Sequence, residues 1–127
     1  MTVEIYCAEQ GSVSSGTMRP EDLIPRLSQE LDDLKDEMLA HYSTSLAAFE
    51  QVSDAKARAA GIDTLLKEIN GRKRSNPLYY TSEDVSWDVD ELFTSLDEFS
   101  PDGCYFGGHP GDGCDYGFWQ YGEDEVL

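Results

Sequence analysis

The sequence contains no lysine or arginine after Arg74, although it has 127 residues and 26 acidic side chains. Residues 1–74 carry 13 acidic and 9 basic side chains, a net charge of −4, whereas residues 75–127 carry 13 acidic and no basic ones, a net charge of −13. A surface this acidic repels nucleic acid and anionic membranes and attracts basic proteins. Because acidity also aids solubility in general, the segregation of the charge is more informative than its total.

Long apolar runs and paired cysteines are also missing. No stretch approaches the ~20 consecutive apolar residues that cross a bilayer, and residues 1–6 lack the basic start and apolar stretch of a signal peptide. The three cysteines are an odd number with no C-x-x-C pair, which argues against a secreted disulfide framework. We therefore expect a cytoplasmic protein without a membrane partner, long enough to bury one modest core.

The first 74 residues carry mainly helical patterns. Residues 2–7 alternate and predict a short strand, and the Gly- and Ser-rich residues 11–17 predict a loop. A helix is expected to begin near Pro20, where proline and acidic residues suit a first turn. Its apolar residues recur every three or four positions and form a heptad seam, which consists of Ile24, Leu27, Leu31, Leu34 and Met38.

This seam has two candidate partners, a second helix of the same chain or a second copy in a homodimer. Beyond Tyr42 the pattern shifts, so that either Ser43–Ser45 cap a second helix or one long helix continues with a stutter. We favour two helices, the second ending at Asn70–Gly71. The cations Arg72–Arg74 suit the last turn of a helix better than a nucleic-acid site, given the 26 acids around them.

The region from residue 75 onward predicts a separate acidic unit. Residues 83–99 predict a short helix with apolar residues on one face and carboxylates on the other, and Pro101–Gly103 end it. Aromatic residues on both sides of the glycine-rich stretch 109–113 predict a β-hairpin that packs on this helix. The expected fold class is α+β, with a helical hairpin or long coiled-coil-like helices and a short strand in 1–74, and the short helix and aromatic hairpin in 75–127. We expect the two regions to form one compact unit.

The hairpin segment carries the most distinctive motif. The stretches Tyr105-Phe106-Gly107, His109-Pro110-Gly111-Asp112-Gly113 and Asp115-Tyr116-Gly117-Phe118-Trp119 resemble a C-terminal motif of small uncharacterised proteins from phages and other mobile elements. The resemblance covers this segment alone and implies a context, not an activity. In that context, a small protein that disarms host machinery is expected.

The same segment also contains metal-ligand side chains. Cys104, His109 and Cys114, with Cys7 as a fourth, are candidate zinc ligands, but four residues between neighbours is not a finger or ribbon spacing. A phosphate loop would need a lysine or a helix N-terminus, and a calcium loop would need regularly spaced acids. Glycines that permit tight turns and aromatics that fill a core explain the segment better. We expect no metal and no cofactor.

Catalytic signatures are absent as well. The three cysteines are candidate nucleophiles and His41 and His109 candidate bases, yet no family signature accompanies them and no G-x-S-x-G occurs. We therefore do not expect an enzyme.

The leading hypothesis is an inhibitor of the anti-CRISPR or anti-restriction type, whose acidic, DNA-mimicking surface binds a basic host protein. The expected binding residues are Glu83, Asp84, Asp88, Asp90, Glu91, Asp97 and Glu98, extended by Asp33, Asp36 and Glu37 of the first helix. One alternative is a dimeric assembly module that docks through aromatic anchors of the hairpin, namely Tyr105, Tyr116, Phe118 and Trp119. A second alternative is a small metal-binding protein or enzyme.

Overall fold

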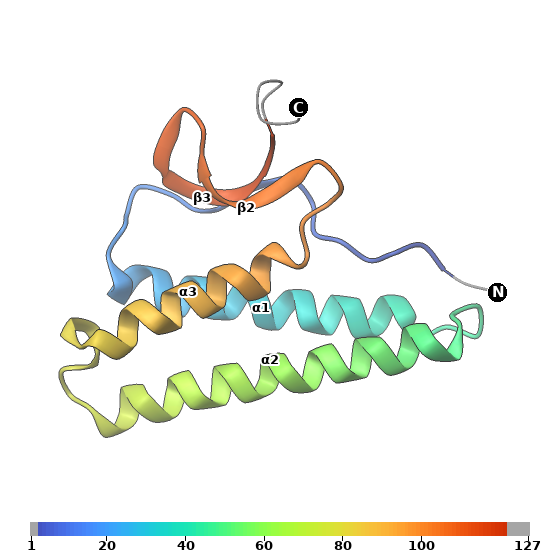
Figure 1. Cartoon of the computed structure of the whole chain (residues 1–127), viewed down its shortest axis with the longest axis horizontal. Coiled ribbons are helices and arrows are strands. Elements are labelled where there is room, and N and C mark those ends of the chain that lie inside the picture. The colour runs from blue at the N-terminus through green and yellow to red at the C-terminus, as the bar shows by residue number, and fades with distance from the viewer. Residues whose placement is uncertain (1–2, 122–127) are drawn as a thin grey trace.

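The structure is a computed structural model that describes residues 3–121 (Figure 1). Within these residues, three α-helices and a short 3₁₀ helix accompany a three-stranded antiparallel sheet, which confirms the predicted α+β class. The elements follow in the order β1 (Gly11–Ser14), α1 (Pro20–Tyr42), α2 (Phe49–Ser75), the 3₁₀ helix η1 (Tyr79–Thr81), α3 (Glu83–Asp97), β2 (Cys104–His109) and β3 (Asp112–Gln120).

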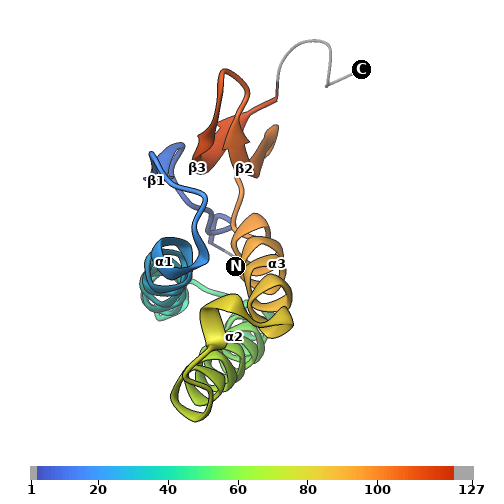
Figure 2. The ribbon, with the colours of Figure 1, turned by 90° about the vertical axis from the view of Figure 1, so that its left-hand side faces the viewer.

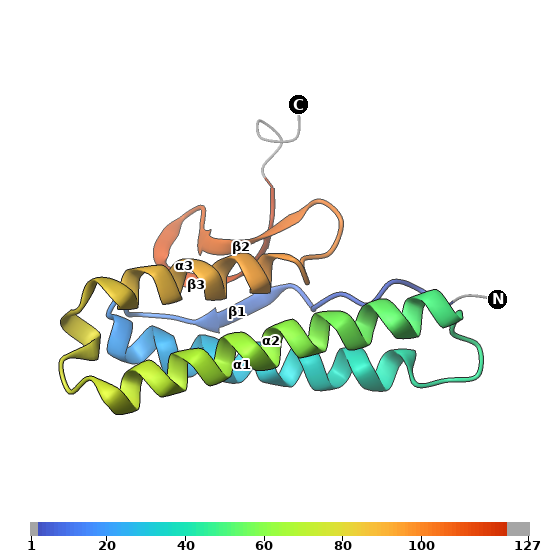
Figure 3. The ribbon, with the colours of Figure 1, turned by 60° about the horizontal axis from the view of Figure 1, so that its bottom comes forward.

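The helices α1 and α2 form the predicted hairpin, with the chain reversing between Tyr42 and Phe49 (Figure 3). The expected cap at Ser43–Ser45 is wrong, because α2 begins six residues after Ser43 and its N-cap position is Ala48, whose N–H donates to Gln51 Oε1 at 3.0 Å. The expected end at Asn70–Gly71 is also wrong. The helix continues through Gly71 to Ser75 and has three cations in its last turn, where they interact favourably with the negative end of the helix dipole.

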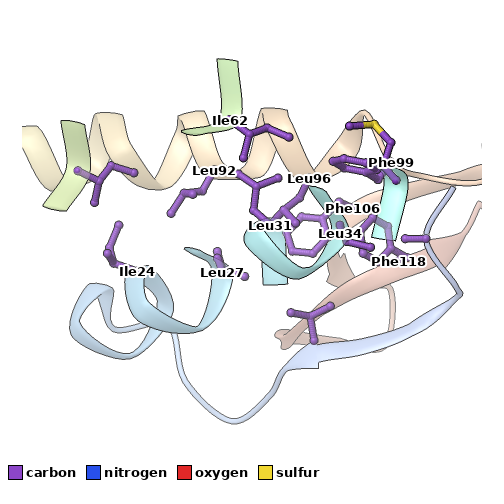
Figure 4. Close-up of a cluster of buried hydrophobic side chains, with 14 of the residues drawn as sticks. Ile24, Leu27, Leu31, Leu34, Ile62, Leu92, Leu96, Phe99, Phe106 and Phe118 are labelled. Carbon is purple, nitrogen blue, oxygen red and sulfur yellow. The ribbon is translucent and has the colours of Figure 1, made fainter. Parts of the chain in front are cut away.

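The heptad seam of α1 packs inside the chain. Figure 4 shows Leu31 and Leu34 of the seam among Ile62 of α2 and residues of α3 and the sheet. All five seam residues are at most 4% exposed. The seam is therefore not free to pair with a second copy of the folded chain, and the assignment of Ile24, Leu27, Leu31, Leu34 and Met38 to a dimer surface is corrected.

The sheet has the strand order β1-β3-β2 and joins the two ends of the described chain. Gly11 pairs with Phe118, and Phe106 of β2 pairs with Phe118 from the other side. The strand expected at residues 2–7 is not found in 3–7, which have no regular structure, and residue 2 lies outside the described range. The strand lies instead at Gly11–Ser14, inside the predicted loop, because the edge of β3 supplies a partner that the local sequence does not reveal.

The elements stack in layers, with the sheet over α1 and α3 and with α2 on the far side of these helices (Figure 2). Phe106 and Phe118 point from the sheet to the helices, where Phe93 of α3 lies 5.3 Å from Phe106 between ring centroids. One cluster of buried side chains includes residues of α1, α2, α3, β1, β2 and β3. The predicted halves 1–74 and 75–127 thus share one hydrophobic core.

Candidate functional site

The solvent-facing side of α3 carries two rows of carboxylates. At 100° per residue, positions seven apart lie almost above one another on a helix, one step being about 10 Å long. Glu83, Asp90 and Asp97 form one row, and Asp84, Glu91 and the C-cap residue Glu98, whose backbone is still helical, form the second. All six are exposed and together occupy about 140° of the helix circumference. We call this set the acidic rows.

A tryptophan stands between the two rows. Trp87 is 71% exposed, because it lies outside the buried apolar face of α3. Positions three and four residues away are its neighbours on the helix surface. All four of these positions carry acidic residues, namely Glu83, Asp84, Asp90 and Glu91. Trp87 is not among the binding residues predicted from the sequence. The signal available was this symmetric arrangement of four acids around one aromatic residue.

The acidic rows are not neutralised by the chain itself. Among residues 3–121, the acids that form ion pairs lie in α1 and α2, together with Asp88 of α3, and none is a member of the rows. Asp97 does accept hydrogen bonds from the Phe106 N–H at 2.9 Å and the Ser100 hydroxyl at 3.3 Å, which tie the end of α3 to β2. The rows therefore present an uncompensated negative field to solvent.

Asp88 does not belong to this surface, which corrects the sequence prediction. It is 3% exposed and accepts hydrogen bonds from two nitrogens of Arg72 and from the Tyr79 hydroxyl, the latter at 2.6 Å. Burial, followed by the bond to Asp88, raises the pKa of Tyr79, while the same carboxylate raises the pKa of Arg72. Asp88 holds α3 against α2 and η1, so the acidic rows project from a fixed helix.

Three acids of α1 do not extend the rows either. α1 and α3 pack against each other through their buried faces, so their exposed faces point away from each other (Figure 2). Asp33, Asp36 and Glu37 lie on the exposed side of α1. Lys35 Nζ lies 3.6 Å from Asp36 Oδ1, and the Tyr6 hydroxyl donates a hydrogen bond to Glu37 Oε2 at 2.6 Å. Of the predicted binding residues, the six members of the acidic rows thus share one exposed face, and Asp33, Asp36 and Glu37 lie on another.

A hollow of about 410 Å³ separates the N-terminal segment from α1. Glu30, Glu37 and Tyr6 line it, together with the exposed thiol of Cys7. Burial raises the pKa of Glu30. Arg26 lowers it by a smaller amount, and Asp33 and Glu37 each raise it more weakly still. Burial and the bond to Glu37 raise the pKa of Tyr6. The bond from the Tyr6 hydroxyl to Glu37 fastens the N-terminal segment to α1.

The hairpin divides its aromatic residues between two faces. Phe118 is buried and cannot act as an anchor, while Tyr116 is half-buried and packs on Phe93 at 5.3 Å between ring centroids. Tyr105 and Trp119 form a cross-strand pair on the opposite face and are half-buried. The Trp119 indole N–H donates to the Asp115 carbonyl at 3.1 Å. Of the four predicted anchors, Phe118 is buried, while Tyr105, Tyr116 and Trp119 are each half-buried.

The candidate zinc ligands and catalytic groups are spread over the fold. Cys104 is buried, Cys7 is exposed, and His109 Nδ1 accepts a hydrogen bond from the Gly111 N–H at 2.9 Å. His41 Nε2 lies 2.6 Å from the Glu4 carbonyl oxygen. In the part of the chain that the structure describes, no three His, Cys, Asp or Glu side chains converge as metal ligands do.

Comparison with protein-family models, with curated proteins and with solved structures gave no match. Among the described helices, none has the length and apolar character that a membrane crossing requires.

Proposed function

We propose that the protein binds a basic, nucleic-acid-binding surface of a host protein through the acidic rows of α3 and thereby keeps nucleic acid away from it. The observation that carries the proposal is the pair of carboxylate rows, which are exposed on α3 and form no ion pair with any residue of the described range 3–121. The resemblance of the hairpin segment to a motif of phage and mobile-element proteins is the reason to propose an inhibitor that acts in the cytoplasm of a host cell. An effector or nuclease that defends the host against foreign DNA is the fitting class of target.

The charge density of the rows is close to that of a nucleic-acid strand. From Glu83 to Glu98 the helix rises about 22 Å, so six carboxylates give about one negative charge per 4 Å. One strand of duplex DNA carries a phosphate about every 3.4 Å along the axis. A basic groove that accepts a strand of DNA would therefore meet a similar linear density on α3.

The positions of the acids also cost stability, which favours a binding role over simple solubility. Glu83 and Asp84 suit the positive N-terminal end of the helix, but Asp97 and Glu98 lie at its negative end, and the last turn of α3 contains no basic residue. A charge at the unfavourable end of a helix dipole costs about 0.3–1 kcal/mol. Acids that served only solubility could occupy any exposed position without this cost.

The experiment compares two variants with equal net charge. In the first, Glu83→Gln, Asp90→Asn, Glu91→Gln and Glu98→Gln neutralise four members of the rows and spare Asp97, which bonds to β2. In the control, Glu9→Gln, Asp33→Asn, Glu50→Gln and Asp54→Asn neutralise four exposed acids on other elements.

Basic host proteins captured by the tagged wild-type chain at low salt are purified, and displacement of labelled duplex DNA from each is followed by fluorescence anisotropy. We expect the row variant to lose about 10-fold or more in affinity and much of its salt dependence, and the control to retain both. Equal affinities for the two folded variants, or capture without any displacement of DNA, would refute the proposal.

A further inference from the structure

The exposed indole of Trp87 lies at the mouth of a groove between α2 and α3. The groove has a volume of about 400 Å³ and is lined by Leu65, Glu68, Arg72, Asp84, Trp87, Asp88 and Glu91. Its four carboxylates face a single guanidinium, so its net charge is −3. Arg72 donates two hydrogen bonds to Asp88, and Glu68 also acts on its charge, so one cation is shared among four carboxylates. The groove is both electronegative and bordered by an aromatic face.

We propose that this groove receives an arginine side chain of the basic partner, whose guanidinium stacks on Trp87 and bonds to Asp84 or Glu91. This inference rests on the proposed function and names the partner group that the site selects. The complementary charge is positive, and the flat guanidinium fits the indole face and a carboxylate at the same time. A lysine ammonium is more strongly hydrated and lacks the planar, two-pronged geometry, so it matches the site less well.

The exposure of Trp87 has a physical consequence for binding. An exposed indole gains free energy when a partner covers it, and aromatic residues surrounded by a polar rim are typical centres of binding energy in protein interfaces. On α3, Trp87 is the large apolar residue that remains exposed, while Val85, Leu92 and Leu96 are buried. The carboxylates around it then act as the polar rim and attract the cation to the ring.

The test uses two peptide probes of equal length and charge, one containing nine arginines and the other nine lysines. Binding is measured by anisotropy of a fluorophore on the peptide, with the wild type and with Trp87→Leu and Trp87→Phe. Phe49→Leu is the matched control, because Phe49 is 86% exposed at the opposite end of α2. Circular dichroism establishes that each variant is folded.

We expect wild type to bind the arginine peptide more tightly than the lysine peptide, and Trp87→Leu to lose about 3- to 30-fold in affinity for the arginine peptide. Trp87→Phe should retain part of the affinity, and Phe49→Leu should match wild type. Equal losses for the two peptides in Trp87→Leu would show a general apolar cover and overturn the arginine assignment.

The two proposals fail in different ways. If the row variant loses affinity but Trp87→Leu does not, the acidic rows bind the partner and the proposal that the groove receives an arginine is wrong. If neither variant loses affinity, the proposed function is wrong as well. A second copy of the chain is the other source of exposed arginines. Light scattering that shows a dimer of the wild type, disrupted by Trp87→Leu, would assign the groove to self-association and overturn its assignment to a partner.

Discussion

Arg72 donates two hydrogen bonds to the Asp88 carboxylate, from Nε to Oδ2 at 3.0 Å and from Nη2 to Oδ1 at 2.6 Å. This pair joins the last turn of α2 to the middle of α3, and the Tyr79 hydroxyl of η1 bonds to the same carboxylate. Asp88, the buried acid of α3, is thus bonded to three donor atoms, while the exposed acids of α3 make no ion pair within the part of the chain that the structure describes. The buried side of α3 is therefore bonded to α2 and η1, and its exposed side carries the acidic rows.

Replacing Asp88 by alanine should lower the free energy of unfolding by about 3–5 kcal/mol, because the change leaves the partly buried Arg72 guanidinium and the Tyr79 hydroxyl without an acceptor. Urea denaturation followed by circular dichroism measures the loss. Asp90→Ala removes the same group two residues away on the exposed side and should change stability by less than about 0.5 kcal/mol. Similar values for the two variants would contradict the structural role of Asp88.

Leu31 tests where the heptad seam packs. Its side chain is completely buried within the single chain, so Leu31→Ala should cost about 2–5 kcal/mol of stability in a concentration-independent manner. Thermal unfolding at several protein concentrations measures this cost, and Leu46→Ala, on the exposed connection between α1 and α2, serves as the mild control. A melting temperature that rises with protein concentration in the wild type would instead point to a seam shared between copies.

Glu30 should destabilise the fold at neutral pH. Since burial raises its pKa in the folded state above the unfolded value, the folded state binds more protons, and the free energy of unfolding falls as the pH rises through this window. Glu30→Gln should therefore stabilise the protein at pH 7, by some tenths of a kcal/mol because the group is partly solvated. The gain should vanish below the unfolded pKa of about 4.3.

Urea unfolding at several pH values from acidic to neutral measures this difference. Glu50→Gln, which changes an exposed acid in the first turn of α2, is the control and should show no such gain. A Glu30→Gln variant that is less stable than wild type at pH 7 would contradict the prediction.

Gly117 of β3 should tolerate no side chain. A Cβ atom there would collide with the backbone oxygen of Gly11 in β1. Gly117→Ala should therefore force β1 away from β3 and cost about 1–3 kcal/mol. Gly113→Ala, in the same strand, meets nothing within 4 Å and should be nearly neutral. Amide hydrogen exchange across Gly11–Ser14 reports the loss of pairing, and unchanged protection in Gly117→Ala would refute the close approach.

The sequence was sufficient where a pattern is local. The spacing of Ile24, Leu27 and Leu31 predicted the buried face of α1, because helical periodicity alone decides which residues share a face. The hairpin followed from aromatic residues around a glycine-rich turn. By contrast, β1 has only Val13 to bury, so no alternation marks it, and its pairing depends on a strand about a hundred residues later in the chain.

The candidate site shows the same division. The exposed acids of α3 were found from composition, but Asp88 was placed among them because its sequence neighbours are acidic. Its spacing with Val85 and Leu92 was the available signal, since three and four residues put it on the apolar face. Which cation neutralises it depends on the packing of α2 against α3, and this packing is not encoded in the local pattern.

The pairing of β1 with β3 also orders events during synthesis. Strand β1 leaves the ribosome early, yet the edge it needs is made only when residues 112–120 have been translated. Until then the helices can associate, while Val13 and the sheet-facing side of α1 stay uncovered. The sheet can therefore form only after residues 112–120 have been translated, and a nascent chain that stalls before Asp112 would leave apolar surface exposed to chaperones and proteases.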